Sequence, residues 1–389
     1  MHSDHLIKLG PKKPFAKDGD DMADSTDVFV IGGGPAGLAA AIAARKKGFS
    51  VTVADGGKPP VDKACGEGLL PGTLAALREL GICMQAEDGE SFRSIRFIDG
   101  NISATANFSR GGGFGVRRTV LHQKMAARAE ECGVELLWNA PVTSFSKDGV
   151  IVGGEPILAT WIVGADGIHS RVRHWSGLEA GMNQRLRFAQ RRHYRVKLLT
   201  DCVEVYWGKG IQAYVTPLAN EETCLVLISR DPAMNFDVAL REFPTLADGL
   251  RNAEPGSVQR GAVTATCRLD HVCRGNVALV GDASGTVDAV TGEGLGLSFR
   301  QALALADALE TGDLGKYQSA HRQLAQRPHR MSRLLLLLDQ FGTLRSRVLR
   351  GLARDPDLFS RLLIAHITET SSAFLAEMGV RLGWRLITA

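Results

Sequence analysis

The stretch Asp27-Val-Phe-Val-Ile-Gly-Gly-Gly-Pro-Ala-Gly37 decides the fold. Its apolar run predicts a short buried strand over residues 27–32, and the Ala-rich segment 35–48 predicts a helix. A second apolar run predicts a strand over residues 49–55. Neighbouring strands joined through one helix pair in parallel, so the unit indicates a doubly wound sheet of the α/β class.

The same stretch contains the pattern G-x-G-x-x-G between the strand and the helix. Gly32 permits a tight turn, Gly34 leaves bare backbone for a pyrophosphate, and Gly37 lets helix and strand pack closely. Amides at the helix N-terminus favour bound phosphate. Asp55, at the end of the next strand, is placed to accept a hydrogen bond from a ribose hydroxyl. A tight packing turn alone would explain the glycines, but together with Asp55 they predict a dinucleotide site.

Two more glycine-acid motifs each follow an apolar strand. Gly281-Asp282 follows residues 276–280, and Gly164-Ala-Asp166-Gly167 follows a second such run. The segment Asp288-Ala-Val-Thr-Gly-Glu-Gly-Leu-Gly296 then opens a helix expected over residues 297–309. The amides and dipole of that N-terminus would stabilise negative charge on a bound group, although a glycine-rich helix cap is the simpler alternative.

In this order and at these distances, the motifs resemble the FAD-dependent superfamily of para-hydroxybenzoate-hydroxylase-type monooxygenases and geranylgeranyl reductases. The resemblance covers about residues 26–312. It implies FAD as the cofactor. Because only one G-x-G-x-x-G occurs in the chain, either NAD(P)H binds transiently as the reductant or a protein donor delivers the electrons. The histidines have no metal-ligand spacing, so no metal site is expected. The expected cofactor-binding residues are Gly32, Gly34, Pro35, Ala36, Gly37, Asp55, Gly66, Arg118, Gln123, Asp166, Gly281, Asp282, Gly292, Glu293, Gly294 and Leu295.

The motifs are divided between the two branches of this superfamily. The hydroxylases usually carry His soon after Gly-Asp and then Pro-x-x-Gly-Gln-Gly, whereas this chain has Ser284 and Gly292-Glu-Gly294. That departure resembles the reductase branch, as does Lys63-Ala-Cys-Gly-Glu-Gly68. Tyr214-Val-Thr-Pro217 falls where the reductases show Tyr-x-Trp-x-Phe-Pro, but the Trp and Phe are missing.

Two residues are candidates for catalysis. Cys65 would be a reactive thiol if a cation such as Lys63 lowered its pKa, and is otherwise a small packed residue. Tyr214 would face the substrate by the resemblance, or would fill the core of a sheet. Arg118 and Gln123 share a predicted helix, where an arginine contacts FAD in the family or else lies on a solvated face.

The rest of the chain predicts a second sheet and a helical end. Residues 56–115 are expected to be mostly irregular around one helix near 71–80, with strands of the second sheet near 91–115. Alternating apolar residues from 186 to 229 predict half-buried antiparallel strands, whose basic start, residues 191–195, is interpreted as a solvated strand edge. The expected domains are an N-terminal arm (1–25), a discontinuous FAD-binding domain (26–185 and 268–312), an antiparallel-sheet substrate domain (186–267) and a helical C-terminal region (313–389).

Composition excludes several classes of protein. The 389 residues carry 46 Lys and Arg against 42 Asp and Glu, and a net charge of +4 does not suggest a nucleic-acid binder. With 44% hydrophobic and 23% charged residues, this is an ordinary folded chain. Seven scattered cysteines without C-x-x-C favour free thiols in a reducing compartment. A polar start without a signal-peptide pattern adds to the expectation of a cytoplasmic protein.

The C-terminal region is basic and amphipathic. Arginines at 330, 333, 345, 347, 350 and 354 accompany the apolar run Leu334–Leu338. Such helices can contact an anionic membrane peripherally, or can pack on the protein with their arginines in water.

Hydroxylation is the favoured interpretation of the reaction. Reduced FAD would react with dioxygen, and the protein would hydroxylate a small apolar aromatic or polyketide-like substrate. The alternative is reduction of a carbon-carbon double bond in a lipophilic substrate, as in the geranylgeranyl reductases. A halogenase or a protein that only binds FAD is the third class, and the Trp-x-Trp-x-Ile-Pro stretch of the halogenases is missing here.

Overall fold

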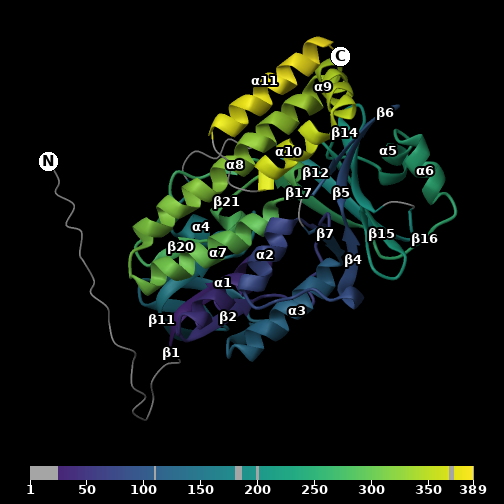
Figure 1. Ribbon diagram of the computed structural model, residues 1–389. Helices are drawn as coiled ribbons and strands as arrows, with labels where there is room; N and C mark the ends of the chain where they lie inside the picture. The colour runs from purple at the N-terminus through teal and green to yellow at the C-terminus, as the bar shows by residue number, and fades with distance from the viewer. Residues whose placement is uncertain (1–24, 109–110, 180–185, 199–200, 368–371, 389) are drawn as a thin grey trace.

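The computed structural model describes residues 25–108, 111–179, 186–198, 201–367 and 372–388. The N-terminal arm expected over residues 1–25 lies outside this range except for Ser25. Figure 1 shows a parallel sheet with its helices at one end of the molecule and an antiparallel sheet at the other. The C-terminal helices lie along one side and join the two ends.

The first sheet has a parallel centre in the order β20-β11-β1-β2-β8, which confirms the α/β class. Helix α1 connects β1 to β2 as the glycine-rich stretch predicts, and packs against α7 and α3. The strands are β1 (Ser25–Ile31), β2 (Val51–Asp55), β8 (Glu135–Trp138), β9 (Val142–Ser146), β10 (Gly149–Val152), β11 (Glu155–Gly164), β19 (Cys273–Arg274) and β20 (Val277–Leu279). The helices are α1 (Pro35–Lys46), α3 (Arg118–Glu131), the short α4 (Arg171–Trp175) and α7 (Gly294–Glu310).

The second sheet follows the order β16-β12-β15-β14-β13-β5-β6, with β17 also paired to β12. Most pairs are antiparallel, as the alternating pattern predicts, but β13 pairs with β5 in parallel. Its strands are β5 (Ser94–Asp99), β6 (Ile102–Asn107), β12 (Leu186–Arg195), β13 (Cys202–Trp207), β14 (Ile211–Pro217), β15 (Glu222–Ser229), β16 (Glu254–Pro255) and β17 (Arg260–Ala265). Helices α5 (Phe236–Leu240) and α6 (Pro244–Leu250) follow β15.

The segment 56–115 is more regular than its glycines suggest. Besides β5 and β6, it forms a small sheet β3-β7-β4 and helix α2. Its strands approach so closely that a Cβ on Gly115 would lie 1.8 Å from the carbonyl oxygen of Pro217, so this glycine serves strand packing. The elements are β3 (Gly68–Leu69), α2 (Pro71–Glu79), β4 (Gly89–Phe92) and β7 (Gly113–Val116).

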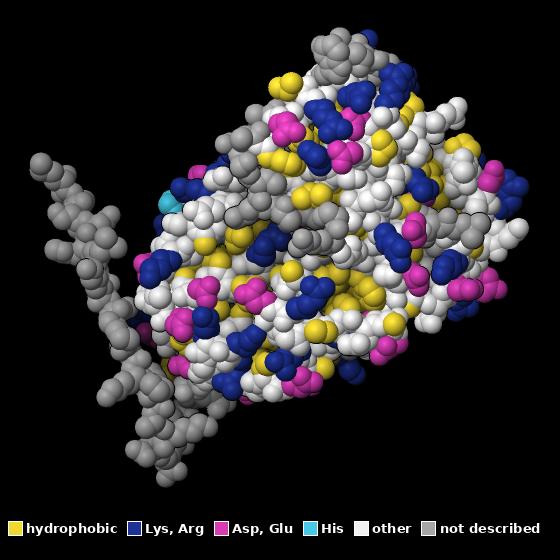
Figure 2. Space-filling view, in the orientation of Figure 1, with side chains coloured by type: hydrophobic (Ala, Val, Ile, Leu, Met, Phe, Trp, Pro, Cys, Tyr) yellow, Lys and Arg dark blue, Asp and Glu magenta, His cyan; other side chains and the backbone are white. Residues whose placement is uncertain are grey.

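The C-terminal helices extend the second sheet. Helices α9 and α10 pack on β6, and buried side chains of β6 and β13, with partly buried ones of β5, form one hydrophobic cluster with them. These helices are α8 (Leu314–Gln340), α9 (Gly342–Arg354), α10 (Pro356–Ile367) and α11 (Ser372–Thr388). Within the described ranges, every helix is too short or too polar to cross a membrane. Figure 2 shows both signs of charge interspersed over one face, with apolar side chains near its centre.

Candidate functional site

A cavity of about 1500 Å³ lies where the two sheets and the C-terminal helices meet. Its volume exceeds the roughly 300–1,000 Å³ of an ordinary ligand pocket, so it has room for a cofactor and a second molecule. One part is bordered by the glycine-rich turns and charged residues of the first sheet, and the other by apolar side chains. The expected site residues that line it are Gly32, Gly34, Pro35, Ala36, Asp55, Cys65, Gly66, Arg118, Asp166, Tyr214, Asp282, Gly292, Gly294 and Leu295.

The glycines in the turn between β1 and α1 have two different roles: Gly32 and Gly37 allow close packing, and Gly34 leaves the cavity wall open. A Cβ on Gly37 would lie 1.8 Å from the Gly32 carbonyl oxygen. Gly32 itself has φ +112°, and a Cβ there would lie 2.5 Å from the carbonyl oxygen of Ala165. Gly34 differs, because a Cβ there would have nothing within 4 Å. The bare backbone of Gly34 therefore faces the cavity at the N-terminus of α1, where amides favour an anionic group.

Asp55 stabilises this turn from the end of β2. Its carboxylate accepts hydrogen bonds from the amides of Gly33 and Gly57, each at 2.7 Å. His122 of α3 supports the turn from the other side, since its Nε2 lies 2.8 Å from the Gly33 carbonyl oxygen. Burial lowers the pKa of His122, which favours the neutral ring. Gln123, which was expected to bind the cofactor from the same helix, is exposed and does not line the cavity.

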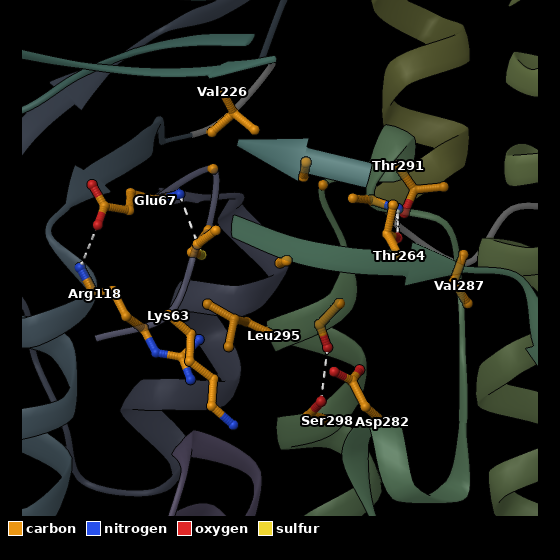
Figure 3. A pocket seen from close by; sticks show the side chains of 18 of the residues that line it. Lys63, Glu67, Arg118, Val226, Thr264, Asp282, Val287, Thr291, Leu295 and Ser298 are labelled. Atoms are coloured by element: carbon orange, nitrogen blue, oxygen red, sulfur yellow. Dashed lines mark hydrogen bonds between the residues drawn. The ribbon is translucent and has the colours of Figure 1, made fainter. Parts of the chain in front are cut away.

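Charged side chains approach the cavity from opposite walls (Figure 3). The side chain of Asp282 is exposed to the cavity, and desolvation by the surrounding protein raises its pKa while the positive charges of Arg118 and Lys63 oppose the shift. Arg118 Nε is buried and has no hydrogen-bond partner among the described residues. Gly281 lies behind Asp282, where a Cβ would come within 2.6 Å of the Ala36 side chain.

The start of α7 offers a second stretch of bare backbone. A Cβ on Gly292 or Gly294 would have nothing within 4 Å, and Gly292 has φ +65°. Leu295 lies beside this backbone on the cavity wall (Figure 3). Glu293 is turned away from the expected position, because it is 6% exposed, does not line the cavity and lies 3.6 Å from His366.

Asp166 serves mainly the local fold. Its carboxylate accepts hydrogen bonds from the Ser170 hydroxyl and from the amides of Arg171 (2.7 Å) and Val172 (3.2 Å), at the start of α4. Gly167, which follows it with φ +85°, also lines the cavity. The segment thus borders the cavity, with its carboxylate already engaged in capping a helix.

The loop around Cys65 differs from the reactive-thiol interpretation. Burial raises the pKa of the Cys65 thiol, and the nearby Arg118 opposes this only in part. The thiol is therefore protonated near neutral pH, and Lys63 does not activate it. Tyr214 lines the cavity from β14, and burial raises the pKa of its phenol, which remains a hydrogen-bond donor.

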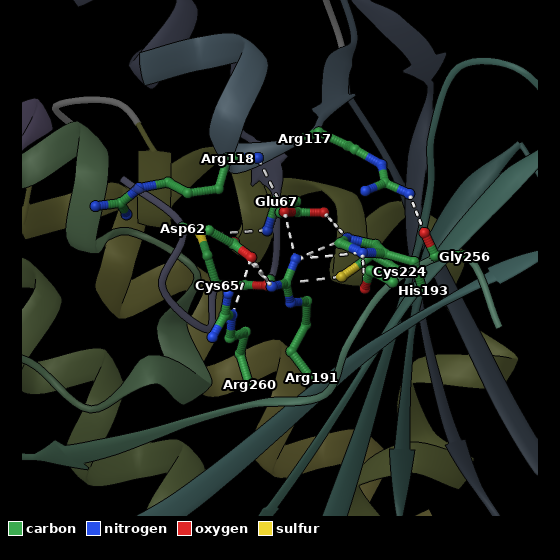
Figure 4. Close-up of polar contacts among 12 residues, drawn as sticks. Asp62, Cys65, Glu67, Arg117, Arg118, Arg191, His193, Cys224, Gly256 and Arg260 are labelled. Carbon is green, nitrogen blue, oxygen red and sulfur yellow. Dashed lines mark hydrogen bonds and ion pairs between the residues drawn. The ribbon is translucent and has the colours of Figure 1, made fainter. Parts of the chain in front are cut away.

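A buried cluster of charged residues holds this loop against the second sheet (Figure 4). The Glu67 carboxylate accepts a 2.9 Å hydrogen bond from the Arg118 amide, and its other oxygen lies 2.6 Å from His193 Nε2. Arg191, only 2% exposed, donates to both oxygens of Asp62 at 2.8 and 3.0 Å. The interpretation of residues 191–195 as a solvated edge is wrong, because β12 is paired on both sides by β15, β16 and β17.

The same cluster contains a trio with metal-ligand chemistry. Ligand atoms of Glu67, His193 and Cys224 lie within 4.8 Å of one another. However, Arg191 Nη1 lies 3.1 Å from His193 Nε2 and 3.4 Å from the Glu67 carboxylate. Arg191 therefore supplies the positive charge that balances this carboxylate.

The second part of the cavity is apolar. It lies between the second sheet and helices α8 to α11, and we name it the apolar arm. Sequence patterns did not indicate that the C-terminal helices contribute to the site. The residues that define the apolar arm are Phe92, Ile95, Phe97, Val203, Val205, Met331, Leu334, Leu335, Leu338, Val348, Leu352, Phe359, Leu362, Leu363 and Leu382.

Comparison with known proteins identifies the family. Residues 25–232 match the family model described as FAD binding domain, which is more than half of the chain. The chain belongs to the FAD-binding-domain family. This confirms the resemblance to the FAD-dependent hydroxylase and reductase superfamily, with FAD as its cofactor.

Relatives of the flavoprotein include enzymes of both kinds. A menaquinone reductase of Mycobacterium tuberculosis is 27% identical over 323 residues, covering 75% of this chain and 78% of its own. A candidate 2-heptyl-3-hydroxy-4(1H)-quinolone synthase of Rhodococcus erythropolis is 30% identical over 330 residues, covering 77% and 84%. The crystal structure of p-nitrophenol 4-monooxygenase from Pseudomonas putida shares the fold, with TM-score 0.75, 16% identity and coverage of 90% and 100%. The flavoprotein is an FAD-dependent oxidoreductase.

The residues on the cavity wall fit FAD. Gly34 would offer bare backbone to the pyrophosphate, Asp55 lines the same wall and would accept a hydrogen bond from a ribose hydroxyl, and Arg118 has an unpartnered Nε among the described residues. Gly292 and Gly294 offer bare backbone for the flavin ring. When bound, FAD supplies hydride or oxygen-activating chemistry. The chain's own residues would hold it through α1 and α7, whose N-terminal amides favour negative charge.

Proposed function

We propose that the flavoprotein reduces a double bond in a lipophilic substrate, with the reactive part at the flavin and the tail in the apolar arm. The observation that carries this proposal is the apolar arm itself. It continues the cofactor cavity between β5, β13 and the C-terminal helices, and its apolar lining suits a hydrocarbon chain. Burial of a hydrocarbon tail stabilises binding by about 0.8 kcal/mol per methylene, so a long tail can supply most of the affinity.

Two further observations support reduction over hydroxylation. The Cys65-Gly-Glu67 loop and the Gly292-Glu-Gly294 turn both line or support the cavity, and both resemble the reductase branch. The relative from M. tuberculosis acts, by its name, as a reductase of a quinone. NAD(P)H would deliver the electrons transiently.

Of the two candidate catalytic residues, Tyr214 is the better placed. Its hydroxyl lies 3.4 Å from the Val290 carbonyl oxygen and 3.5 Å from Gln212 Oε1, so it is held weakly beside the start of α7. A phenol with a raised pKa can donate a hydrogen bond to a substrate throughout the physiological pH range. Cys65 would act only as a small neutral wall residue.

Hydroxylation is the second candidate, because the relative from R. erythropolis is named for a hydroxylated product. Mass spectrometry separates the two reactions. The purified flavoprotein is incubated with NADPH and naphthoquinones or phenols that carry an alkenyl tail, with and without air, and the products are re-oxidised before mass measurement so that a hydroquinone does not count as a reduced double bond. A mass gain of about 2 Da that persists without oxygen supports reduction, whereas an oxygen-dependent gain of about 16 Da overturns it in favour of hydroxylation. A Gly34→Val variant without FAD is the matched control.

We also propose that the C-terminal helices contact a membrane surface. Leu334 both lines the apolar arm and is 48% exposed, so the arm reaches the surface there. Leu337 of α8 and Phe341, between α8 and α9, are 41% and 53% exposed, and Arg330 and Arg333 of α8 are exposed too. A lipophilic substrate could then pass from a bilayer into the arm without crossing water.

A further inference from the structure

His366 occupies an unusual position on the cavity wall. It belongs to α10, is 7% exposed and lines the cavity beside Thr291 and Gly292 at the start of α7. The C-terminal helices thus bring a histidine to the junction between the cofactor part and the apolar arm. No sequence motif indicates this, because 73 residues separate His366 from Glu293.

The polar atoms at this junction lack good partners. Neither ring nitrogen of His366 makes a well-formed hydrogen bond with the described residues, although the Thr291 backbone lies beside the ring, and Glu293 Oε2 makes none either. The nearest approach between the two side chains is 3.6 Å, from His366 Nε2 to Glu293 Oε2. Buried polar atoms are almost always satisfied in native proteins, so three unsatisfied atoms beside a cavity point to a bound polar group.

We propose that His366, oriented by Glu293, hydrogen-bonds an oxygen atom on the ring of the substrate. The inference rests on the proposed function and narrows it to molecules with a carbonyl-bearing or hydroxyl-bearing ring and an apolar tail. The ring would lie at the junction, where the flavin-facing turn and His366 meet, and the tail would occupy the arm. His366 is therefore a specificity-determining residue, and Glu293 positions it.

The charges around His366 decide when it can donate. Burial lowers its pKa, Glu293 and the Thr291 backbone oppose this, and the cations Arg300 and Arg327 add to the lowering. The ring is therefore neutral near neutral pH. When it gains a proton, one N–H can face Glu293 and the other can donate to a carbonyl oxygen. The affinity for a carbonyl-bearing ring should therefore rise as the pH falls through the pKa of His366, and this pKa lies below the usual range for histidine.

The test measures binding to the FAD-loaded protein by titration calorimetry, with no turnover required. The two probes are a naphthoquinone with a decyl tail and a naphthalene with the same tail. Wild-type protein should bind the quinone at least about tenfold more tightly, because a buried polar site rejects an analogue that lacks the matching oxygen. His366→Leu should lose this preference and the pH dependence, and His366→Asn should keep part of the preference.

Leu363→Ala is the matched control, since Leu363 lies on the same helix and lines the apolar arm. It should weaken both probes equally. FAD content and thermal stability of each variant show whether it is folded, and His366→Asn carries the test if His366→Leu does not fold. An unchanged quinone preference in a folded His366 variant overturns the inference. If the quinone binds through His366 but gains no hydrogen under turnover, the proposed reduction fails while the inference stands.

Discussion

Gly34 and Gly37 are three residues apart, yet their substitution should fail in different ways. Gly34 has φ −71° and ψ 176°, which any residue adopts, and a Cβ there has no neighbour within 4 Å. Gly34→Val should therefore change the stability of the FAD-free protein by no more than about 0.5 kcal/mol. Its side chain would instead occupy the space that the pyrophosphate needs.

The contrast comes from Gly37. Its Cβ would lie 1.8 Å from the backbone oxygen of Gly32, which cannot rotate away. Overpacking of this kind costs about 1–3 kcal/mol, so Gly37→Ala should unfold at a lower temperature even without FAD. It should also bind FAD weakly, because the turn must shift.

Calorimetry with and without FAD measures both effects. At a free FAD concentration of about 100 times Kd, the wild-type protein gains about 2.7 kcal/mol, or roughly 3 °C in Tm for a chain of this size. Gly34→Val should show a wild-type Tm without FAD and no rise when FAD is added. A Gly34→Val protein that keeps the yellow flavin spectrum and the full rise in Tm would refute the role given to Gly34. An unchanged FAD-free Tm in Gly37→Ala would refute the packing argument.

Three further predictions test other parts of the site. The folded-state pKa of Asp282 is raised, so ionisation of this carboxyl destabilises the FAD-free fold as the pH rises above its unfolded pKa. Asp282→Asn should therefore raise the FAD-free Tm at neutral pH and weaken FAD binding. Calorimetry with and without FAD measures both effects. In the wild-type protein the buried Asp288 carboxylate lies 2.8 Å from the Arg187 guanidinium, and Arg187→Met removes this partner. Urea unfolding should show that the free energy of unfolding falls by about 3–5 kcal/mol. An unchanged urea midpoint would contradict this prediction. Phe341→Glu should reduce sedimentation with anionic vesicles several-fold, whereas Val258→Glu, at a more exposed apolar site elsewhere in the chain, should not.

The sequence predicted the cofactor part of the site better than the substrate part. The β1-α1-β2 unit follows from apolar runs, turn glycines and Asp55, all within 29 residues. Such local patterns determine local geometry. Gln123 was expected beside the cofactor with Arg118, but a sequence does not fix the rotation of a helix about its axis. In the structure that rotation brings His122 to the Gly33 carbonyl and leaves Gln123 exposed.

The apolar arm and the junction at His366 could not be predicted in the same way. They depend on how α9 and α10 pack against β6, more than 200 residues earlier in the chain, and on how α8 and α11 pack against α9 and α10. An amphipathic helix has an apolar face whether it meets a membrane, a sheet or a cavity, so its pattern does not choose among them.

The strand β12 did carry a signal that was available in the sequence. Arg187, Ala189, Arg191 and His193 occur at every second position, so they must share one face of a strand. All four are buried. Basic residues at every second position, with a small apolar residue among them, indicate a strand face that is polar and buried, and not a solvated strand edge.

These buried charges explain how the substrate sheet keeps its position relative to the flavin. Arg187 reaches Asp288, just before the turn at the start of α7, while Arg191 and His193 reach Asp62 and Glu67 on the loop that carries Cys65. A shift of β12 by one residue would turn all three side chains to the opposite face and leave the partner carboxylates buried and unpaired. Since an unpaired buried charge costs several kcal/mol, that register is strongly disfavoured. These buried charged contacts therefore hold both cofactor-facing segments, the turn before α7 and the Cys65 loop, against the single strand β12. They thereby fix the place where a substrate ring would meet the flavin.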